Sequence, residues 1–376
     1  MLLQKLKILG SSAKWDSCGG TKKKSLLKAG VPAEYSSFIQ DCASTGEKCR
    51  LMKVLLSNKC IHDCKYCKNS VGSQKKAELT PEEVAFAFAS LHKGGFVDGL
   101  FLSSSVTEDP DKTADKIIES ARLIREKYFF RGYIHLKVLP GVCKDKILEM
   151  SRYADRLSLN IEAPSKAYFS ELCSTKDYSQ DIEKRLGWLS DARSKGLLKS
   201  FTTQLVVGAS VDSDLEIIER MNKLYSETSL YRTYFSAFEP VKGTAFENRP
   251  AEDPSREHRL YQCDWLIRIY GFKLDEVKKA LDEKGMLAKG TDPKVLIAMK
   301  CADKYPVDVN SASFCELIKV PGIGPKAAKK IMHLRESGVK FKDIKDLRKS
   351  GAIAKRALPF IQLENSRQLR ISETNI

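Results

Sequence analysis

The sequence lacks the features of membrane and secreted proteins. It has no run of 18 apolar residues, so no segment is expected to span a bilayer. Its first residues, MLLQKLKILGSSAKWD, contain neither a long apolar core nor a small-residue cleavage site, so we expect a cytoplasmic rather than a secreted protein. The 11 cysteines are an odd number spread over 376 residues, which favours thiols and metal ligands over a disulfide framework.

Acidic residues are scarce at both ends of the chain. Residues 1–76 contain 15 Lys and Arg against 5 Asp and Glu, and residues 311–376 contain 14 against 6. Residues 77–310 are nearly neutral, with 35 against 37, so the formal net charge of +16 comes from the ends. Basic ends fit either an ordinary solvated surface or a surface that binds a polyanion such as nucleic acid.

The middle of the chain consists of alternating strand and helix patterns. Thr80-Pro-Glu-Glu is typical of a helix start, with a capping Thr, Pro at the first position and acids in the first turn. Six apolar runs alternate with helical patterns and predict an α/β fold with a parallel sheet, either open or closed into a barrel. Chemistry is then expected at the carboxyl ends of the strands. The six runs cover residues 51–56, 99–102, 133–139, 156–161, 202–207 and 231–238.

The change of pattern after residue 240 predicts the domain organisation. No strand pattern follows that point, and the remaining segments have helical periodicity. We therefore expect four segments: a basic N-terminal extension (1–49), the strand–helix domain (50–250), a helical connector (251–305) and an all-α C-terminal domain (306–376).

Three cysteines directly after the first predicted strand form the main chemical motif. Cys60, Cys64 and Cys67 have the spacing CxxxCxxC. Three thiolates so close together can bind a four-iron cluster and leave one iron open to a chelating substrate. Two alternatives are a zinc site that includes His62 and a turn of free thiols.

The motif, with Tyr66 before its third cysteine, resembles that of the radical S-adenosylmethionine (SAM) enzymes. This resemblance implies a partial (β/α)6 TIM-type barrel and a [4Fe–4S] cluster on Cys60, Cys64 and Cys67. It also implies that SAM binds the open iron and is cleaved to a 5′-deoxyadenosyl radical, which removes hydrogen from the substrate.

The resemblance places further residues at the cofactor by position. The main chain of Tyr66 would meet adenine, and Ser104 and Ser105 stand where the superfamily binds the SAM amino group with a GGE-like motif. Lys137 would bind the SAM carboxylate, and the alternative is that its side chain faces the surface. Gly208 would let the backbone approach adenine, and the alternative is that it only forms a turn. The set of expected SAM contacts is Tyr66, Ser104, Ser105, Lys137, Asn160, Glu162, Gln204 and Gly208.

The remaining cysteines permit other roles. Cys18, Cys42 and Cys49 could hold an auxiliary cluster or simply be buried, and Cys143 could donate a hydrogen atom to a substrate radical. The cysteines in helical patterns are expected to be packed, and these are Cys173, Cys263, Cys301 and Cys315.

A second motif, VPGIGPKAA, lies between two helical patterns, the first of which is expected to be capped by Asn310 or Ser311. Gly322 and Gly324 would bare backbone amides at a helix start, where an anion binds well. Lys326, Lys329 and Lys330 add positive charge there. The segment resembles a helix-hairpin-helix motif, which holds the DNA backbone without reading sequence. Residues 347–361 resemble a second copy in which Ala replaces the second Gly; a hairpin for protein contacts is the alternative.

The two motifs occur together with the segments IHLKVLPG, RLSLNIEAPS and HRLYQCDWLIRIYGF. The whole chain, with these segments and the C-terminal hairpin, resembles the DNA modification/repair radical SAM proteins. That resemblance implies an enzyme acting on DNA, an electron donor, and a companion DNA-metabolism protein related to uracil-DNA glycosylase. One alternative is a DNA-binding scaffold or redox sensor with a structural cluster. Another keeps the enzyme but gives it RNA or a free nucleotide as substrate.

Overall fold

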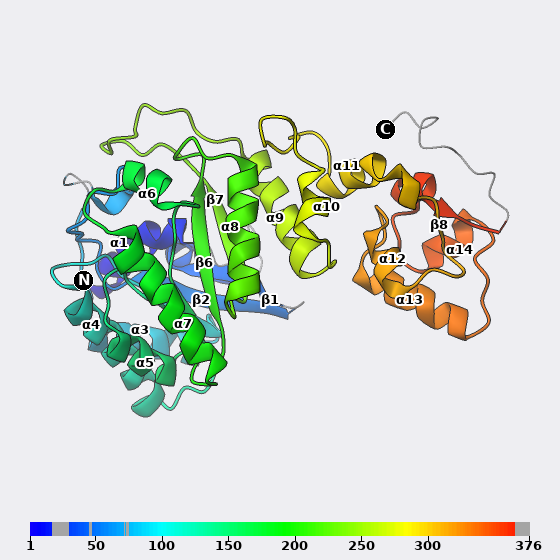
Figure 1. Cartoon of the computed structure of the whole chain (residues 1–376). Coiled ribbons are helices and arrows are strands. Elements are labelled where there is room, and N and C mark those ends of the chain that lie inside the picture. Colours follow the sequence, from blue (N-terminus) through cyan, green and yellow to red (C-terminus); the bar gives the residue numbers. More distant parts are fainter. Residues whose placement is uncertain (17–29, 45–46, 71, 73–74, 365–376) are drawn as a thin grey trace. The chain divides into compact units, whose positions relative to one another are not determined.

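The protein is described by a computed structural model that covers residues 1–16, 30–44, 47–70, 72 and 75–364 (Figure 1). Its internal contacts divide it into two compact units. The barrel unit comprises Met1–Asp212 and Lys223–Asp253, and the helical unit comprises Ser213–Asn222 and Pro254–Ile376. In the part of the chain that the structure describes, no helix is long and apolar enough to cross a membrane.

A curled seven-stranded sheet is the framework of the barrel unit. The strands follow one another in chain order, with β1 antiparallel to β2 and all later neighbours parallel. Right-handed crossovers between sequential parallel strands put the helices on one face, so the sheet curls into a half barrel (Figure 1). The strands are β1 (Ile39–Ser44), β2 (Glu47–Leu55), β3 (Gly99–Ser103), β4 (Tyr133–Lys137), β5 (Arg156–Ser158), β6 (Phe201–Val207) and β7 (Arg232–Ala237).

The six predicted parallel strands are confirmed as β2 to β7, and two other elements correct the expectation. β1 was not predicted, because its sequence IQDCAS has no apolar run, yet it pairs with β2 over its whole length. In the helical unit, β8 (Val307–Asp308) and β9 (Ile361–Gln362) pair in parallel, although no strand was expected beyond residue 240. Two residues are too few to show a strand period in a sequence.

Helices follow the strands as the sequence patterns predict. The expected start at Thr80 is confirmed: its hydroxyl accepts from the Glu83 amide (3.2 Å), and the Glu83 carboxylate accepts from the Thr80 amide (3.0 Å). Such a cap stabilises a helix by about 1 kcal/mol. The helices are α1 (Leu2–Ser12), α3 (Pro81–Lys93), α4 (Pro110–Glu126), α5 (Lys144–Tyr153), α6 (Lys166–Leu172), α7 (Lys184–Ser194) and α8 (Asp214–Glu227).

The helical unit is built from short helices around its own apolar core. Ser313 caps α12 through a capping box with Glu316, which corrects the expected cap at Asn310 or Ser311. Asn310 instead exchanges two hydrogen bonds with the Phe341 backbone (2.8 and 3.0 Å). The helices are α9 (Pro254–Arg268), α10 (Leu274–Lys278), α11 (Pro293–Lys300), α12 (Phe314–Lys319), α13 (Pro325–Glu336), α14 (Ile344–Lys349) and α15 (Ala354–Ala357).

Two buried lysines inside the half barrel meet a carboxylate from the N-terminal segment. Lys53 on β2 and Lys137 on β4 are 3% and 9% exposed. The Lys137 ammonium forms an ion pair with Asp16, and Lys53 donates to the Asp16 carbonyl and to Gln40 Oε1 (2.8 Å). Burial acts to raise the pKa of Asp16, but the two ammonium groups outweigh it and hold that pKa below its usual value. Residues of the expected N-terminal extension are thus part of the barrel interior.

This buried pair predicts a strong coupling between Asp16 and Lys137. Asp16→Ala should lower the free energy of unfolding by about 3 kcal/mol, because it leaves the buried Lys137 ammonium without its carboxylate. Adding Lys137→Met should restore much of that loss. The measurement is denaturant unfolding of the native protein, the two single variants and the double variant, which together form a double-mutant cycle. Lys14→Ala is the control, since Lys14 pairs with Glu239 at the surface (3.7 Å) and should contribute less than about 1 kcal/mol. Independent, additive losses for Asp16 and Lys137 would contradict the coupling.

Candidate functional site

The three motif cysteines lie in one cavity at the carboxyl ends of the strands. The cavity encloses about 1160 Å³, part of it open to solvent, and Cys60, Cys64 and Cys67 line it. Cys64 is buried, the other two are half-buried, and all three are free thiols. The position is the one that a parallel sheet favours for chemistry.

The loop that carries these cysteines is fastened to a segment more than 100 residues away. The Asp63 carboxylate accepts from the amides of Ser174 (3.1 Å) and Thr175 (3.2 Å) and from the Cys173 thiol (3.1 Å). The Lys65 amide also donates to the Leu172 carbonyl (2.9 Å). Burial acts to raise the pKa of Asp63, but the hydrogen bonds from residues 173–175 hold it well below its usual value. Asp63 therefore stays charged and keeps the loop in place.

The sequence patterns did not identify Cys173 and Lys176 as site residues. The Lys176 ammonium lies 3.1 Å from Cys64 Sγ, and both Lys176 and Cys64 line the cavity. The neighbouring Cys173 thiol and the Lys176 charge lower the pKa of Cys64, whereas burial raises the pKa of Cys67 to about 11. The available signal was the polar run Ser174-Thr175-Lys176-Asp177 after α6, which no local spacing links to the cysteines.

Seven of the eight expected SAM contacts line this cavity, and Gly208 does not. Gly208 follows β6 with φ +82°, and a Cβ built on it would lie 2.7 Å from the Glu252 Cβ. This placement favours the turn-forming interpretation of that glycine. The residues that the cavity brings together are Tyr66, Ser104, Ser105, Lys137, Asn160, Glu162 and Gln204.

Several groups on the cavity wall fit a polar ligand. Ser105 Oγ and His62 Nε2 are buried and have no hydrogen-bond partner among the described residues. Glu162 has a left-handed backbone (φ +60°), which its ladder bonds to Gln204 (3.0 Å) and Val206 (2.8 Å) hold in place. Burial raises the pKa of the Glu162 carboxyl, and Lys137 and Lys176 oppose that shift. Unsatisfied polar atoms and a strained residue beside three thiols are what a cofactor site presents.

The structure bears on the zinc alternative for the cysteine motif. Among the described residues, no three His, Cys, Asp or Glu side chains converge closely enough to hold a single metal ion. His62 Nδ1 instead contacts Thr175 Oγ1 (3.1 Å), and burial lowers the pKa of His62 to about 4. Each cysteine of a [4Fe–4S] cluster binds a different iron, so cluster ligands need not converge on one point.

None of the other described cysteines lines the cavity, although Cys173 contacts Asp63 of the cysteine loop. Cys42 and Cys49 face each other across β1 and β2, and Cys18 is outside the described residues. Cys143 precedes α5 and does not line the cavity. Cys263 and Cys301 are buried as expected, but Cys315 is exposed, which corrects its predicted packing.

In the helical unit, the hairpin at Gly322 and the hairpin at Gly351 are joined by a backbone hydrogen bond. Gly322 has φ +83°, its carbonyl accepts from the Ile353 amide (2.9 Å), and a Cβ on it would lie 2.6 Å from the Ile353 carbonyl. Only glycine fits that position without strain. Gly324 is the N-cap of α13 with an ordinary φ of −105°, and Lys326, Lys329 and Lys330 are exposed beside it.

The second hairpin aligns with the first differently from the prediction that Ala replaces the second glycine. Gly351 matches Gly322, with φ +82°. Ile353 is the N-cap of α15, as Gly324 is of α13, so Ile353 rather than Ala354 takes the place of the second glycine. Its side chain is 56% exposed. The two hairpins therefore present different surfaces at equivalent points.

Helix α11 fixes both hairpins. The buried Lys294 ammonium donates to the Ile323 carbonyl (2.8 Å) and lies over the Tyr270 ring (4.4 Å). Burial lowers the pKa of Lys294 to about 7. On the other hairpin, Arg356 pairs with Asp292 at the start of α11 (2.7 Å).

Comparisons with known families match both motifs. Residues 54–223 match the model of the radical SAM superfamily, and residues 303–360 match the helix-hairpin-helix motif. Similar curated proteins include two biotin synthases. The one from Fusobacterium nucleatum is 22% identical over 223 residues, which are 57% of this chain and 57% of that protein. The one from Pelobacter propionicus is 22% identical over 238 residues, 61% of this chain and 67% of that protein.

Solved structures with partial similarity include two further proteins. The FeFe-hydrogenase maturase HydG from Carboxydothermus hydrogenoformans has a TM-score of 0.45 at 17% identity, over 57% of this chain and 50% of that one. Methylornithine synthase (PylB) has a TM-score of 0.47 at 14% identity, over 71% and 76%.

The network around Asp63 predicts that this side chain governs cluster retention. Asp63→Ala removes the acceptor for residues 173–175, so the reconstituted protein should hold less iron and lose it faster in air. Asp63→Asn is the matched control, because its amide oxygen keeps part of the network. The measurement is iron content and the absorbance of the cluster after desalting. Equal iron retention by the Ala variant and the native chain would contradict this role.

Proposed function

We propose that this chain, which contains a radical SAM domain and a helix-hairpin-helix motif, is a radical SAM enzyme that modifies or repairs DNA. The observation that carries the proposal is the presence, in one chain, of the thiol-lined cavity and the glycine hairpin with its exposed lysines. The cavity offers a place for chemistry on a small group. The hairpin offers amides and cations to the phosphate backbone, which positions DNA without selecting sequence.

The cofactors are those of the superfamily, a [4Fe–4S] cluster and SAM. When bound, they supply a 5′-deoxyadenosyl radical that removes a hydrogen atom from the substrate. Cys60, Cys64 and Cys67 would hold three of the irons. The seven wall residues described above would hold SAM, and Lys176 adds a further ammonium group to the cavity, which Lys68 and Lys137 also line. Because Asp16 already pairs with Lys137, Lys176 is the better placed of the two to meet an incoming carboxylate.

Two partners complete the proposal. An external electron donor must reduce the cluster, and the family resemblance implies a companion DNA-metabolism protein related to uracil-DNA glycosylase. The ten described cysteines are free thiols, which suits the reducing conditions of the cytoplasm.

The cluster assignment predicts that the chemistry depends on each motif cysteine. Replacing Cys60, Cys64 or Cys67 by Ala should abolish SAM cleavage, because each thiolate binds one iron. Cys263→Ala is the control, since that cysteine is buried in the helical unit. The measurement is 5′-deoxyadenosine formed from SAM by the reduced, reconstituted protein. A native protein that retained its cluster but cleaved no SAM, with or without damaged duplexes, would favour the scaffold or redox-sensor alternative.

The hairpin assignment predicts steeply salt-dependent, sequence-independent DNA binding. Lys326, Lys329 and Lys330 changed together to Gln should reduce the slope of log K against log salt by roughly one per lost phosphate contact. The cluster spectrum should not change. Gly322→Ala is a poor probe of DNA contact, because its Cβ would collide with the second hairpin. An unchanged slope in the triple Gln variant would remove this hairpin from the DNA surface.

A further inference from the structure

The loop that holds the motif cysteines is also strongly basic. Residues 59–76 contain five lysines and a single acid, Asp63, whose carboxylate faces the backbone and side chains of residues 173–175. We call Lys59, Lys65, Lys68, Lys75 and Lys76 the lysine rim.

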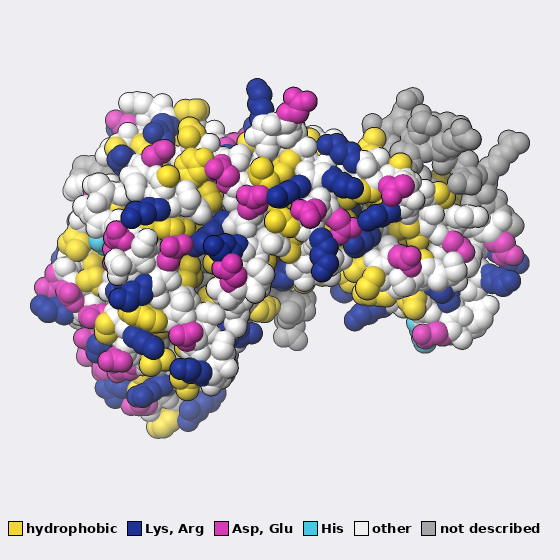
Figure 2. Space-filling model, in the orientation of Figure 1, with side chains coloured by type: hydrophobic (Ala, Val, Ile, Leu, Met, Phe, Trp, Pro, Cys, Tyr) yellow, Lys and Arg dark blue, Asp and Glu magenta, His cyan; other side chains and the backbone are white. Residues whose placement is uncertain are grey.

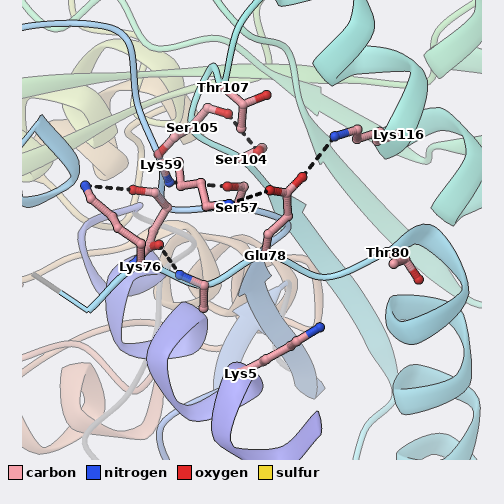
Figure 3. Close-up of polar contacts among 12 residues, drawn as sticks. Lys5, Ser57, Lys59, Lys76, Glu78, Thr80, Ser104, Ser105, Thr107 and Lys116 are labelled. Carbon is pink, nitrogen blue, oxygen red and sulfur yellow. Dashed lines mark hydrogen bonds and ion pairs between the residues drawn. The ribbon is translucent and has the colours of Figure 1, made fainter. Parts of the chain in front are cut away.

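Part of the rim shapes the loop itself. Lys59 and Lys116 share the carboxylate of Glu78, at 3.2 and 2.9 Å (Figure 3). Lys76 donates to the carbonyls of Asn69 (3.0 Å) and Asn58 (3.4 Å), which draws the two ends of the loop together. These contacts leave a net positive charge, since one carboxylate serves two ammonium groups.

Of the other three lysines of the rim, one lines the cavity and one is exposed to solvent. Lys68 lines the cavity together with Asn69, and Lys75 is exposed. Neither ammonium has a hydrogen bond or ion pair within the described ranges. The Lys65 ammonium lies over the Phe246 ring (6.0 Å), and the Arg249 guanidinium lies over the same ring (3.5 Å). Of the three acids that line the cavity, Glu239 is paired with Lys14 (3.7 Å) and Asp16 with Lys137, and the third is Glu162.

The size of the cavity determines what can lie on this rim. A space of about 1160 Å³ cannot admit a duplex. A nucleotide that reacts there must therefore leave the base stack, while the phosphates on either side of it stay outside at the mouth. Cations at that mouth are where those phosphates would be held.

We propose that the lysine rim binds the backbone phosphates flanking the reacting nucleotide, as a second contact to nucleic acid separate from the hairpins. The inference rests on the proposed function. An acidic electron-carrier protein would also suit a basic surface. However, a carrier needs only to come near the cluster, whereas Lys68 and Asn69 line the substrate cavity itself. A polynucleotide is one ligand that can place a nucleotide in the cavity and its flanking phosphates on the lysine rim.

The test uses the full, reconstituted chain and a DNA duplex with one unpaired nucleotide. Lys68→Gln/Lys75→Gln should reduce the slope of log K against log salt by up to about 1.8, at about 0.9 for each lost phosphate contact. The matched control is Lys93→Gln/Lys195→Gln, which removes two exposed lysines at the ends of α3 and α7, on the amino side of the strands. The control should keep the native slope, and both variants should keep the native cluster spectrum.

Combining the rim and hairpin variants separates the two surfaces. The slope losses should add, because independent contacts contribute independently. A rim variant with the slope of the control would overturn the inference while leaving the hairpin assignment standing. A native slope combined with slower cluster reduction by an acidic one-electron carrier would reassign the rim to the electron donor. A native chain that bound no duplex would overturn the proposed function, and this inference with it.

Discussion

The site depends on how the cysteine loop is held in place from outside. Among its described residues, the loop has no helix or strand beyond the short turn at Lys68–Ser70. Its shape comes from outside: Asp63 fastens it to residues 173–175, and Ser70 Oγ closes it by donating to the carbonyls of Cys64 (2.9 Å) and Cys67 (2.7 Å). The Lys176 ammonium contacts Cys64 Sγ (3.1 Å) and favours the charged form of that one cysteine. The contacts of Asp63 and Ser70 hold the loop so that the three cysteines lie in the cavity at the carboxyl ends of the strands.

The parts of the structure that the sequence predicted are local. Apolar runs mark the parallel strands, the Thr80 capping box spans four residues, and the cysteine motif spans eight. Gly322 belongs with them, since a hairpin glycine is a turn signal. The parts that were not predicted join distant residues: Asp16 meets Lys137 across 121 positions, and Lys176 meets Cys64 across 112. No periodicity or spacing rule connects such pairs, so the N-terminal residues were not recognised as part of the barrel.

The basic ends of the chain illustrate why net charge is a coarse guide to function. Many N-terminal lysines are directed to internal partners, as Lys53 is to Asp16 and Lys5 is to Glu83 (2.8 Å). On the face shown in Figure 2, basic and acidic side chains are interspersed rather than separated into fields. Among the described residues, the three lysines of the first hairpin are exposed, whereas Lys53 is buried against its partners. The total of +16 does not distinguish these two kinds of cation.

The bond between the Gly322 carbonyl and the Ile353 amide limits how this chain can be divided. Each hairpin supplies part of the other's backbone pairing, and α11 clamps both through Lys294 and Asp292. A fragment that ended between the hairpins would leave the Gly322 carbonyl unpaired and the glycine turn without its support. The smallest portable module is consequently the hairpin pair together with α11. Gene fusions and domain transplants would have to carry that whole block.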